Sequence, residues 1–224
     1  MEIGAGLGSL TLALRETGAD VTAIEVDRGL VPLLRAVVEP AGARVVEADA
    51  LTVDWEALLG PGPWALVANL PYNVATTLVV RLLEEVAAIE RMLVMVQAEV
   101  ADRLVAAPRS PSYGAVSVLV AWWADGEVAG DVPPTVFLPR PNVGSSLVAL
   151  RRRPAPGADY ARFKEVVRAG FAHRRKMLRT TLAGVVEPGA FDAAGVAPTA
   201  RAEELGLDQW CRLAGWRPSG PTPN

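Results

Sequence analysis

Short runs of apolar and β-branched residues alternate with stretches of helical spacing through the first two thirds of the chain. This alternation is typical of a mostly parallel, twisted sheet with connecting helices, so we predict an α/β fold. The predicted strands are Val21–Val26, Ala43–Glu47, Ala65–Ala68, Arg91–Gln97, Val116–Trp123 and Ser145–Leu150. The predicted helices are Leu10–Thr17, Leu30–Val38, Ala75–Ala87 and Glu99–Ala106. We expect Trp122 and Trp123 to pack within their strand rather than to present a platform for a base.

The pattern changes after residue 153. Pro154-Ala155-Pro156-Gly157 interrupts it, and helical periodicity alone continues to about Trp216. We therefore predict a Rossmann-like domain at residues 1–153, a small all-helical domain at 158–216 and a disordered, proline-rich tail at 217–224. Only Met1–Ile3 precede the first glycine, so we expect a truncated first strand.

The composition excludes several classes of protein. With 224 residues, 51% of them hydrophobic, the chain can bury a sizeable core, which excludes a disordered chain and a disulfide-stapled mini-protein. The one cysteine, Cys211, forms no internal disulfide, and His173 has no cysteine or histidine neighbours at ligand spacing, so we predict no metal site. No apolar stretch reaches the ~20 residues that cross a bilayer, and the first residues lack a secretory signal. We expect a cytoplasmic monomer.

Charge is distributed unevenly along the chain. Residues 151–184 contain ten Lys or Arg against two Asp or Glu, whereas the whole chain has a net charge of −3. A basic segment in an acidic protein suits a polyanion such as nucleic acid, and it equally suits a solvated helix face.

A glycine-rich loop, Gly4-Ala5-Gly6-Leu7-Gly8, lies between the first predicted strand and the first helix. Glycines at this place let the backbone approach a ligand, although a structural turn has the same pattern. Glu25 ends the next strand and can accept the ribose hydroxyls of a nucleoside. Ser9 stands where the dinucleotide fingerprint has Gly or Ala, which disfavours NAD. The spacing, with Glu2 before it, favours S-adenosylmethionine.

Two further sequence features follow the third and fourth predicted strands. Asp49-Ala50 is placed to meet the adenine amino group of such a cofactor, or to cap a helix. Asn69-Leu70-Pro71-Tyr72 lies at the carboxyl edge of the sheet, where open α/β folds bind ligands. The Asn69 side-chain oxygen and the carbonyl of Leu70 or Pro71 can accept both hydrogens of an adenine amine, which favours its attack on a methyl sulfonium. Tyr72 can stack on the base; the alternative is turn chemistry with Tyr72 in the core.

Together these motifs resemble the ribosomal RNA adenine dimethyltransferases of the KsgA type. The resemblance rests on residues 2–8, 24–27, 49–50 and 69–72, and continues through Gln97–Arg103, Tyr113-Gly114, Phe137–Ser145 (an FxPxPxVxS motif), Phe171–Arg179 and Arg201–Glu203. It covers the chain to Trp216. It implies a class I S-adenosylmethionine-dependent methyltransferase that dimethylates two adjacent adenines in the 3′-terminal hairpin of 16S rRNA, within a partly assembled small subunit.

The resemblance also assigns residues to roles. The cofactor-binding set that it implies is Glu2, Gly4, Ala5, Gly6, Leu7, Glu25, Val26, Asp49, Ala50 and Asn69. The catalytic set is Asn69, Leu70, Pro71, Tyr72 and Phe137, with Phe137 stacking on the adenine face opposite Tyr72. The RNA-binding set is Arg174, Arg175, Lys176 and Arg179, which we expect on one helix whose apolar side is marked by Phe171, Leu178 and Leu182.

The sequence departs from the resembled family in one respect. Family members carry an amino-terminal segment, with a Gln-Asn-Phe-Leu-like stretch, that closes over the cofactor; the sequence as given lacks it. We expect weaker cofactor binding and activity from this chain. Two alternative functions remain open: an rRNA-binding assembly factor without turnover, and a large-subunit rRNA adenine methyltransferase of the macrolide-resistance type. A dinucleotide-dependent oxidoreductase is disfavoured by Ser9 and by the Asn69–Tyr72 tetrad.

Overall fold

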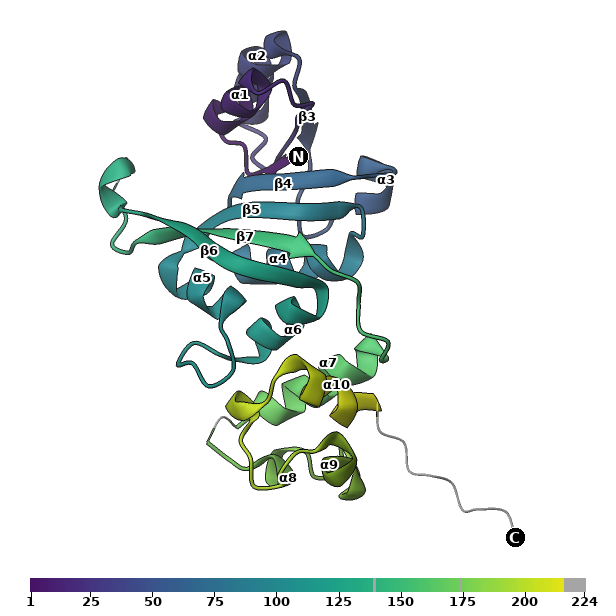
Figure 1. Cartoon of the computed structure of the whole chain (residues 1–224). Coiled ribbons are helices and arrows are strands. Elements are labelled where there is room, and N and C mark those ends of the chain that lie inside the picture. The colour runs from purple at the N-terminus through teal and green to yellow at the C-terminus, as the bar shows by residue number, and fades with distance from the viewer. Residues whose placement is uncertain (139, 174, 216–224) are drawn as a thin grey trace. The chain divides into compact units, whose positions relative to one another are not determined.

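The computed structural model describes residues 1–138, 140–173 and 175–215 (Figure 1). The chain divides into two compact units. The first comprises Met1–Ala101 and Ala124–Arg152, and the second comprises Asp102–Trp123 and the chain from Arg153 onward. The domain bounds 1–153 and 158–216 remain sequence-based predictions, and the predicted tail at 217–224 lies outside the described residues.

The first unit is built on seven strands. They are β1 (Glu2–Ile3), β2 (Thr22–Glu25), β3 (Arg44–Glu47), β4 (Trp64–Asn69), β5 (Ile89–Gln97), β6 (Ala124–Val132) and β7 (Ser145–Arg152). Their order is β3-β2-β1 and β4-β5-β7-β6, and the two parts join where the Val67 N–H donates to the Met1 carbonyl at 3.0 Å. Strand β7 runs antiparallel to both β5 and β6. This is the doubly wound order with one antiparallel strand inserted near an edge.

Helices connect these strands and make up most of the second unit. The α-helices are α1 (Ser9–Glu16), α2 (Val31–Val38), α3 (Trp55–Leu59), α4 (Ala75–Glu85), α5 (Ala98–Val105), α6 (Ala115–Trp123), α7 (Tyr160–Phe171), α8 (Leu178–Thr181), α9 (Gly189–Ala194) and α10 (Leu207–Gly215). Short 3₁₀ turns are η1 (Glu39–Ala41), η2 (Pro134–Val136) and η3 (Ala202–Glu204). None of the described helices is both long and apolar enough to traverse a membrane.

The predicted strand Val116–Trp123 is wrong, because these residues form helix α6 of the second unit. The run is apolar at nearly every position, and such a run does not distinguish a buried strand from a buried helix. Trp122 is fully buried, with its ring centroid 4.2 Å from that of Phe163 and 5.2 Å from that of Tyr160. The tryptophan pair therefore packs in a helical core and not on a strand.

The sequence pattern also missed strand β6. Its residues, ADGEVAGDV, are mostly exposed and include Gly, Asp and Ala, which have low strand propensity. Backbone pairing with β7 makes this segment a strand in spite of its composition. Hydrophobic patterning detects only strands that bury at least one face.

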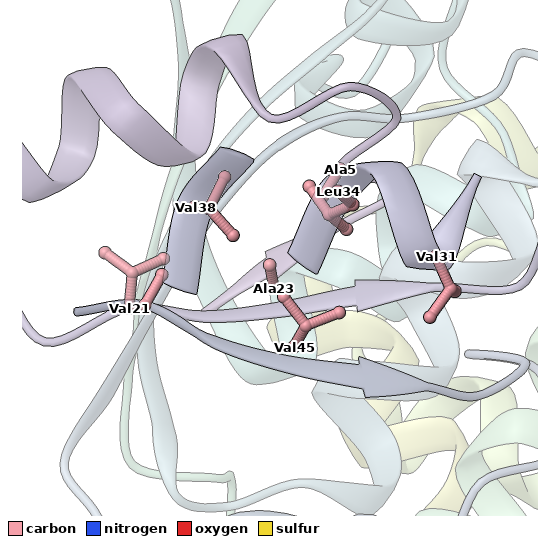
Figure 2. Close-up of a cluster of buried hydrophobic side chains, with 8 residues drawn as sticks. Ala5, Val21, Ala23, Val31, Leu34, Val38 and Val45 are labelled. Atoms are coloured by element: carbon pink, nitrogen blue, oxygen red, sulfur yellow. The ribbon is translucent and has the colours of Figure 1, made fainter. Parts of the chain in front are cut away.

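A hydrophobic cluster fixes the glycine-rich loop against the sheet. Helix α2 packs Val31, Leu34 and Val38 on Ala23 of β2 and Val45 of β3 (Figure 2). Ala5 of the loop belongs to the same cluster. Gly8 ends the loop at φ 89°, and a Cβ there would lie 2.4 Å from Val38 Cγ1, so only glycine fits.

One cavity, of about 520 Å³, lies over β4, β5, β7 and β6. Its lining includes apolar Val67 and Leu93 and the exposed guanidinium-bearing residues Arg91 and Arg151. It contains no residue of the glycine-rich loop or of the 69–72 tetrad. The chemistry predicted from the sequence is therefore not located in this cavity.

Candidate functional site

The predicted site lies where the loops after β1 and β4 meet. A Cβ placed on Gly4 would lie 3.8 Å from Pro71 Cδ and 3.9 Å from the Asn69 carbonyl oxygen. Strands β1 and β4 are neighbours in the sheet. After β1 the chain continues to β2 and β3 on one side, and after β4 it continues to β5 on the other side. This is the topological switch point, at which doubly wound sheets bind ligands.

The first cavity at this edge has a volume of about 420 Å³, which suits a nucleoside-sized molecule. Its lining includes five residues of the predicted cofactor-binding set: Gly4, Glu25, Val26, Asp49 and Ala50. They come from the carboxyl ends of β1, β2 and β3 and the loops that follow, so three consecutive strand ends contribute to one cavity. The sequence analysis did not assign Asn73 and Val74, which precede helix α4, or Leu78 in its first turn, and these residues close the cavity on another side.

Backbone groups hold the Glu25 carboxylate in place. Its Oε2 accepts the N–H of Gly6 at 2.8 Å, and its Oε1 accepts those of Val26 at 2.9 Å and Asp27 at 3.0 Å. Gly6 thereby ties the glycine-rich loop to the end of β2. Because each carboxylate oxygen has two lone pairs, Oε2 can accept a ligand hydroxyl in addition to the Gly6 N–H.

Asp49 closes a turn and does not cap a helix, because the following helix α3 has Asp54 as its cap. The Asp49 Oδ1 accepts the N–H of Leu51 at 2.8 Å, and the Asp49 carbonyl accepts the N–H of Val53 at 2.9 Å. The residue therefore stabilises its own turn. It is also exposed and lines the first cavity.

Five residues of the predicted cofactor-binding set do not line the first cavity, and one of them, Asn69, lines the neighbouring cavity at the same edge. Glu2 is 2% exposed, and its carboxylate accepts a hydrogen bond from the Thr11 hydroxyl. Burial raises the pKa of Glu2, and the Thr11 hydrogen bond partly opposes this effect. Ala5 packs in the α2 cluster, Gly6 bonds Glu25, and Leu7 is 59% exposed.

A second cavity, of about 360 Å³, contains the whole predicted catalytic set. It is lined by Asn69, Leu70, Pro71, Tyr72, Phe137 and Pro141. Phe137 comes from the loop between β6 and β7, more than sixty residues along the chain from the tetrad. The Tyr72 hydroxyl lies 2.8 Å from Ser145 Oγ at the start of β7, which fixes the ring. The sequence analysis placed Ser145 in the resembled motif at Phe137–Ser145 but gave it no role, because its role depends on this contact in space.

The two backbone carbonyls considered for the amine differ in their surroundings. The Pro71 carbonyl accepts the N–H groups of Val74 and Ala75, each at 3.1 Å, where helix α4 begins. The Leu70 N–H donates to Met95 of β5 at 3.1 Å, which fixes the Leu70 peptide at the strand end. The Pro71 oxygen is therefore occupied by the helix, and Leu70 provides the better acceptor for a ligand.

The described residues of the predicted basic set, Arg175, Lys176 and Arg179, do not lie on one helix. Helix α7 ends at Phe171, and helix α8 begins only at Leu178, so the expected continuous helix is wrong. Arg175 and Lys176 are exposed on the intervening turn, and Arg179 is exposed on α8. Leu178 and Leu182 are fully buried. Met177 is extended and forms an isolated bridge with Arg201, which interrupts the helix.

Arg174 lies outside the described residues. Within the ranges that the structure describes, no three His, Cys, Asp or Glu side chains are grouped as a metal site would require.

Comparison with known proteins gives a consistent result. The family model for ribosomal RNA adenine dimethylase matches residues 1–217. The ribosomal RNA small subunit methyltransferase A of Kineococcus radiotolerans is 48% identical over 232 residues, covering 98% of this chain and 77% of that protein. The protein of the same name from Thermobifida fusca is 49% identical over 231 residues, covering 97% of this chain and 80% of that one.

Solved structures agree with the fold. A dimethyladenosine transferase from Plasmodium falciparum has a TM-score of 0.78 at 20% identity, over 95% of this chain and 86% of that one. The 23S rRNA methyltransferase ErmE has a TM-score of 0.71 at 28% identity, over 95% of this chain and 88% of that one. With the strand order described above, these likenesses confirm the predicted class I methyltransferase fold.

Proposed function

Because the chain belongs to the ribosomal RNA adenine dimethylase family, we propose that it transfers methyl groups from S-adenosylmethionine to two adjacent adenines in the 3′-terminal hairpin of 16S rRNA. One observation carries the proposal. Pro71 lines both cavities at the sheet edge, so a methyl donor in one and an adenine in the other would be neighbours across a single residue.

The first cavity fits the cofactor by its volume and its donor set. Gly4, at φ 72°, leaves the backbone open beside the cavity, and Glu25 offers a fixed carboxylate to ribose hydroxyls. Val26 and Ala50 supply apolar walls, and the Asp49 carboxylate accepts a hydrogen bond from the adenine amine. The sulfonium of the bound cofactor supplies an activated methyl group.

The second cavity orients the adenine amine for attack. The Asn69 side-chain oxygen and the Leu70 carbonyl accept one amine hydrogen each, which draws the nitrogen lone pair out of conjugation with the ring. Tyr72, held by Ser145, and Phe137 stack on opposite faces of the base. Such stacking is worth roughly 1–3 kcal/mol per base and offsets the few kcal/mol needed to extrude an adenine.

The basic residues of the second unit supply affinity for the RNA backbone. Arg174, Arg175, Lys176 and Arg179 provide four cationic side chains within six residues of sequence. Contacts of this kind fix a protein on a nucleic acid without reading its sequence. We assign the partly assembled small ribosomal subunit as the partner.

The test is transfer of labelled methyl from S-adenosylmethionine to small subunits that lack the hairpin dimethylation. Large subunits and the Asn69→Ala variant serve as controls. We expect incorporation into small subunits alone, approaching two methyl groups on each of two adenines. Incorporation into large subunits alone would identify an enzyme of the macrolide-resistance type, and binding without incorporation would identify an assembly factor.

A further inference from the structure

A loop of the second unit contains a strained arginine. Arg109, between α5 and α6, has a φ of 71°, and it is the one residue other than glycine with positive φ among those described. Pro108 and Arg109 are the central residues of a turn closed by the Ser110 N–H, which donates to the Ala107 carbonyl at 3.1 Å. A proline followed by a residue of positive φ is typical of a type II turn, which takes Gly or Asn at that place. An arginine there is unfavourable.

The loop is fixed to a second segment at its turn and again after the turn. The Arg109 N–H donates to the Glu203 carbonyl at 2.8 Å, and the Tyr113 hydroxyl donates to the Leu205 carbonyl at 2.7 Å. Tyr113 is 4% exposed, whereas Arg109 is an exposed residue. The backbone of the loop is therefore anchored while its arginine is presented to solvent.

The anchoring segment connects this loop to the basic turn. Arg201 forms a bridge with Met177, and the Leu178 N–H donates to the Ala200 carbonyl at 2.8 Å. Backbone hydrogen bonds thus connect the loop at 107–113 to the segment at 200–205, and that segment to residues 175–179. Glu204 lies on the middle segment, and its Oε1 is engaged by the Arg201 N–H at 2.7 Å.

We propose that Arg109 is a further phosphate contact, and that the RNA-binding surface of the second unit extends from the basic turn to the 107–113 loop. This inference rests on the proposed function. Strained residues are retained where the surroundings over-determine them, and they cluster at functional sites. A glycine at position 109 would relieve the strain, and its N–H could still donate to the Glu203 carbonyl. The arginine side chain is therefore the feature that requires an explanation. The positive charge of Arg109, its exposure and its anchored main chain suit contact with the phosphates of an RNA.

The test uses Arg109→Gly, Arg109→Asn and Arg109→Lys in the full chain, with binding to undermethylated small subunits measured over a series of salt concentrations. Glycine and asparagine accept the positive φ, so their thermal midpoints should equal or exceed that of the unchanged protein. Both should lower the slope of log affinity against log salt by about one phosphate contact, ~0.7–0.9. Lysine keeps the charge and should keep the slope. Arg44→Ala, an exposed arginine of β3 in the first unit, is the matched control and should change nothing.

An unchanged slope and affinity in Arg109→Gly and Arg109→Asn would overturn the inference. A parallel measurement on Arg175→Ala with Lys176→Ala separates this failure from that of the proposed function. If the unchanged protein methylates small subunits and the double variant has a lower salt slope, while the Arg109 variants keep theirs, only the role of Arg109 is rejected. If small subunits are neither methylated nor bound, the proposed function fails as well.

Discussion

The carboxyl edge of the sheet and the basic surface of the second unit hold their functional side chains in different ways. At the sheet edge, hydrogen bonds fix the groups themselves: Glu25 by three N–H donors and Tyr72 by Ser145. On the basic surface, the hydrogen bonds described around Arg175 and Lys176 join backbone groups, and both side chains are exposed on a turn. Transfer chemistry requires direction, whereas attraction to phosphate acts at a distance and tolerates motion. The difference predicts a steep response to substitution at the edge and a graded one on the surface.

The largest effect is expected at Asn69. Removing its side-chain oxygen in Asn69→Ala leaves one amine hydrogen without an acceptor, and loss of one such oriented group typically costs ~10²–10³ in rate. Asn69 is exposed, so thermal unfolding should be unchanged. Single-turnover methyl transfer to small subunits measures the loss. Transfer at the unchanged rate would remove Asn69 from the catalytic set. It would also contradict the steep response to substitution that is expected at the sheet edge.

Next in size is Gly8→Ala, which tests how tightly the edge is built. The added Cβ would lie 2.4 Å from Val38 Cγ1 at a φ of 89°, so crowding and backbone strain act together, at about 2–4 kcal/mol. Gly206→Ala is the control, because nothing lies within 4 Å of its Cβ position. Urea denaturation compares the two. Equal stability of both variants would show that the side chains of the α2 cluster rearrange to accommodate the added methyl group.

Arg175→Ala with Lys176→Ala should give a smaller, salt-dependent loss. Each cation lost lowers the slope of log affinity against log salt by ~0.7–0.9, so the pair should lower it by roughly 1.5. The measurement is binding to small subunits over a range of salt concentrations. The methyl-transfer rate at saturating substrate should stay close to that of the unchanged protein, since these residues do not orient the amine. A loss of that rate equal to the Asn69→Ala loss would contradict the comparison.

The same contrast explains what could be predicted from sequence. Residues at the ends of predicted strands, such as Gly4, Glu25 and Asn69, meet because parallel strands deliver their carboxyl ends to one edge. Phe137 could be placed with them only by family resemblance. The same resemblance includes Ser145, but neither it nor the strand pattern indicates the contact of Ser145 with Tyr72. Helix α6 was misread because an apolar run has no period, and the basic helix because the Met177–Arg201 bridge interrupts it. Contacts between distant segments decided each of these points.

The smallest effect is expected from Glu2→Gln, and it appears only as a dependence on pH. Burial raises the pKa of Glu2 above its ordinary value of 4.5, and nearby Glu25 adds to the shift. The folded chain therefore binds the proton more tightly than the unfolded chain does. Its free energy of unfolding should fall as pH rises from 4.5 through the native pKa, and then level off.

Glutamine keeps an acceptor for the Thr11 hydroxyl and cannot ionise, so the stability of Glu2→Gln relative to the unchanged protein should increase across that same interval. Urea denaturation at several pH values measures the difference. Arg179→Ala, which removes an exposed charge from the basic surface, is the matched control, and its stability difference should be flat over the interval. A flat difference for Glu2→Gln as well would mean that the carboxylate is solvated, and the sheet edge would then be no more rigidly built at Glu2 than the surface with which it is compared.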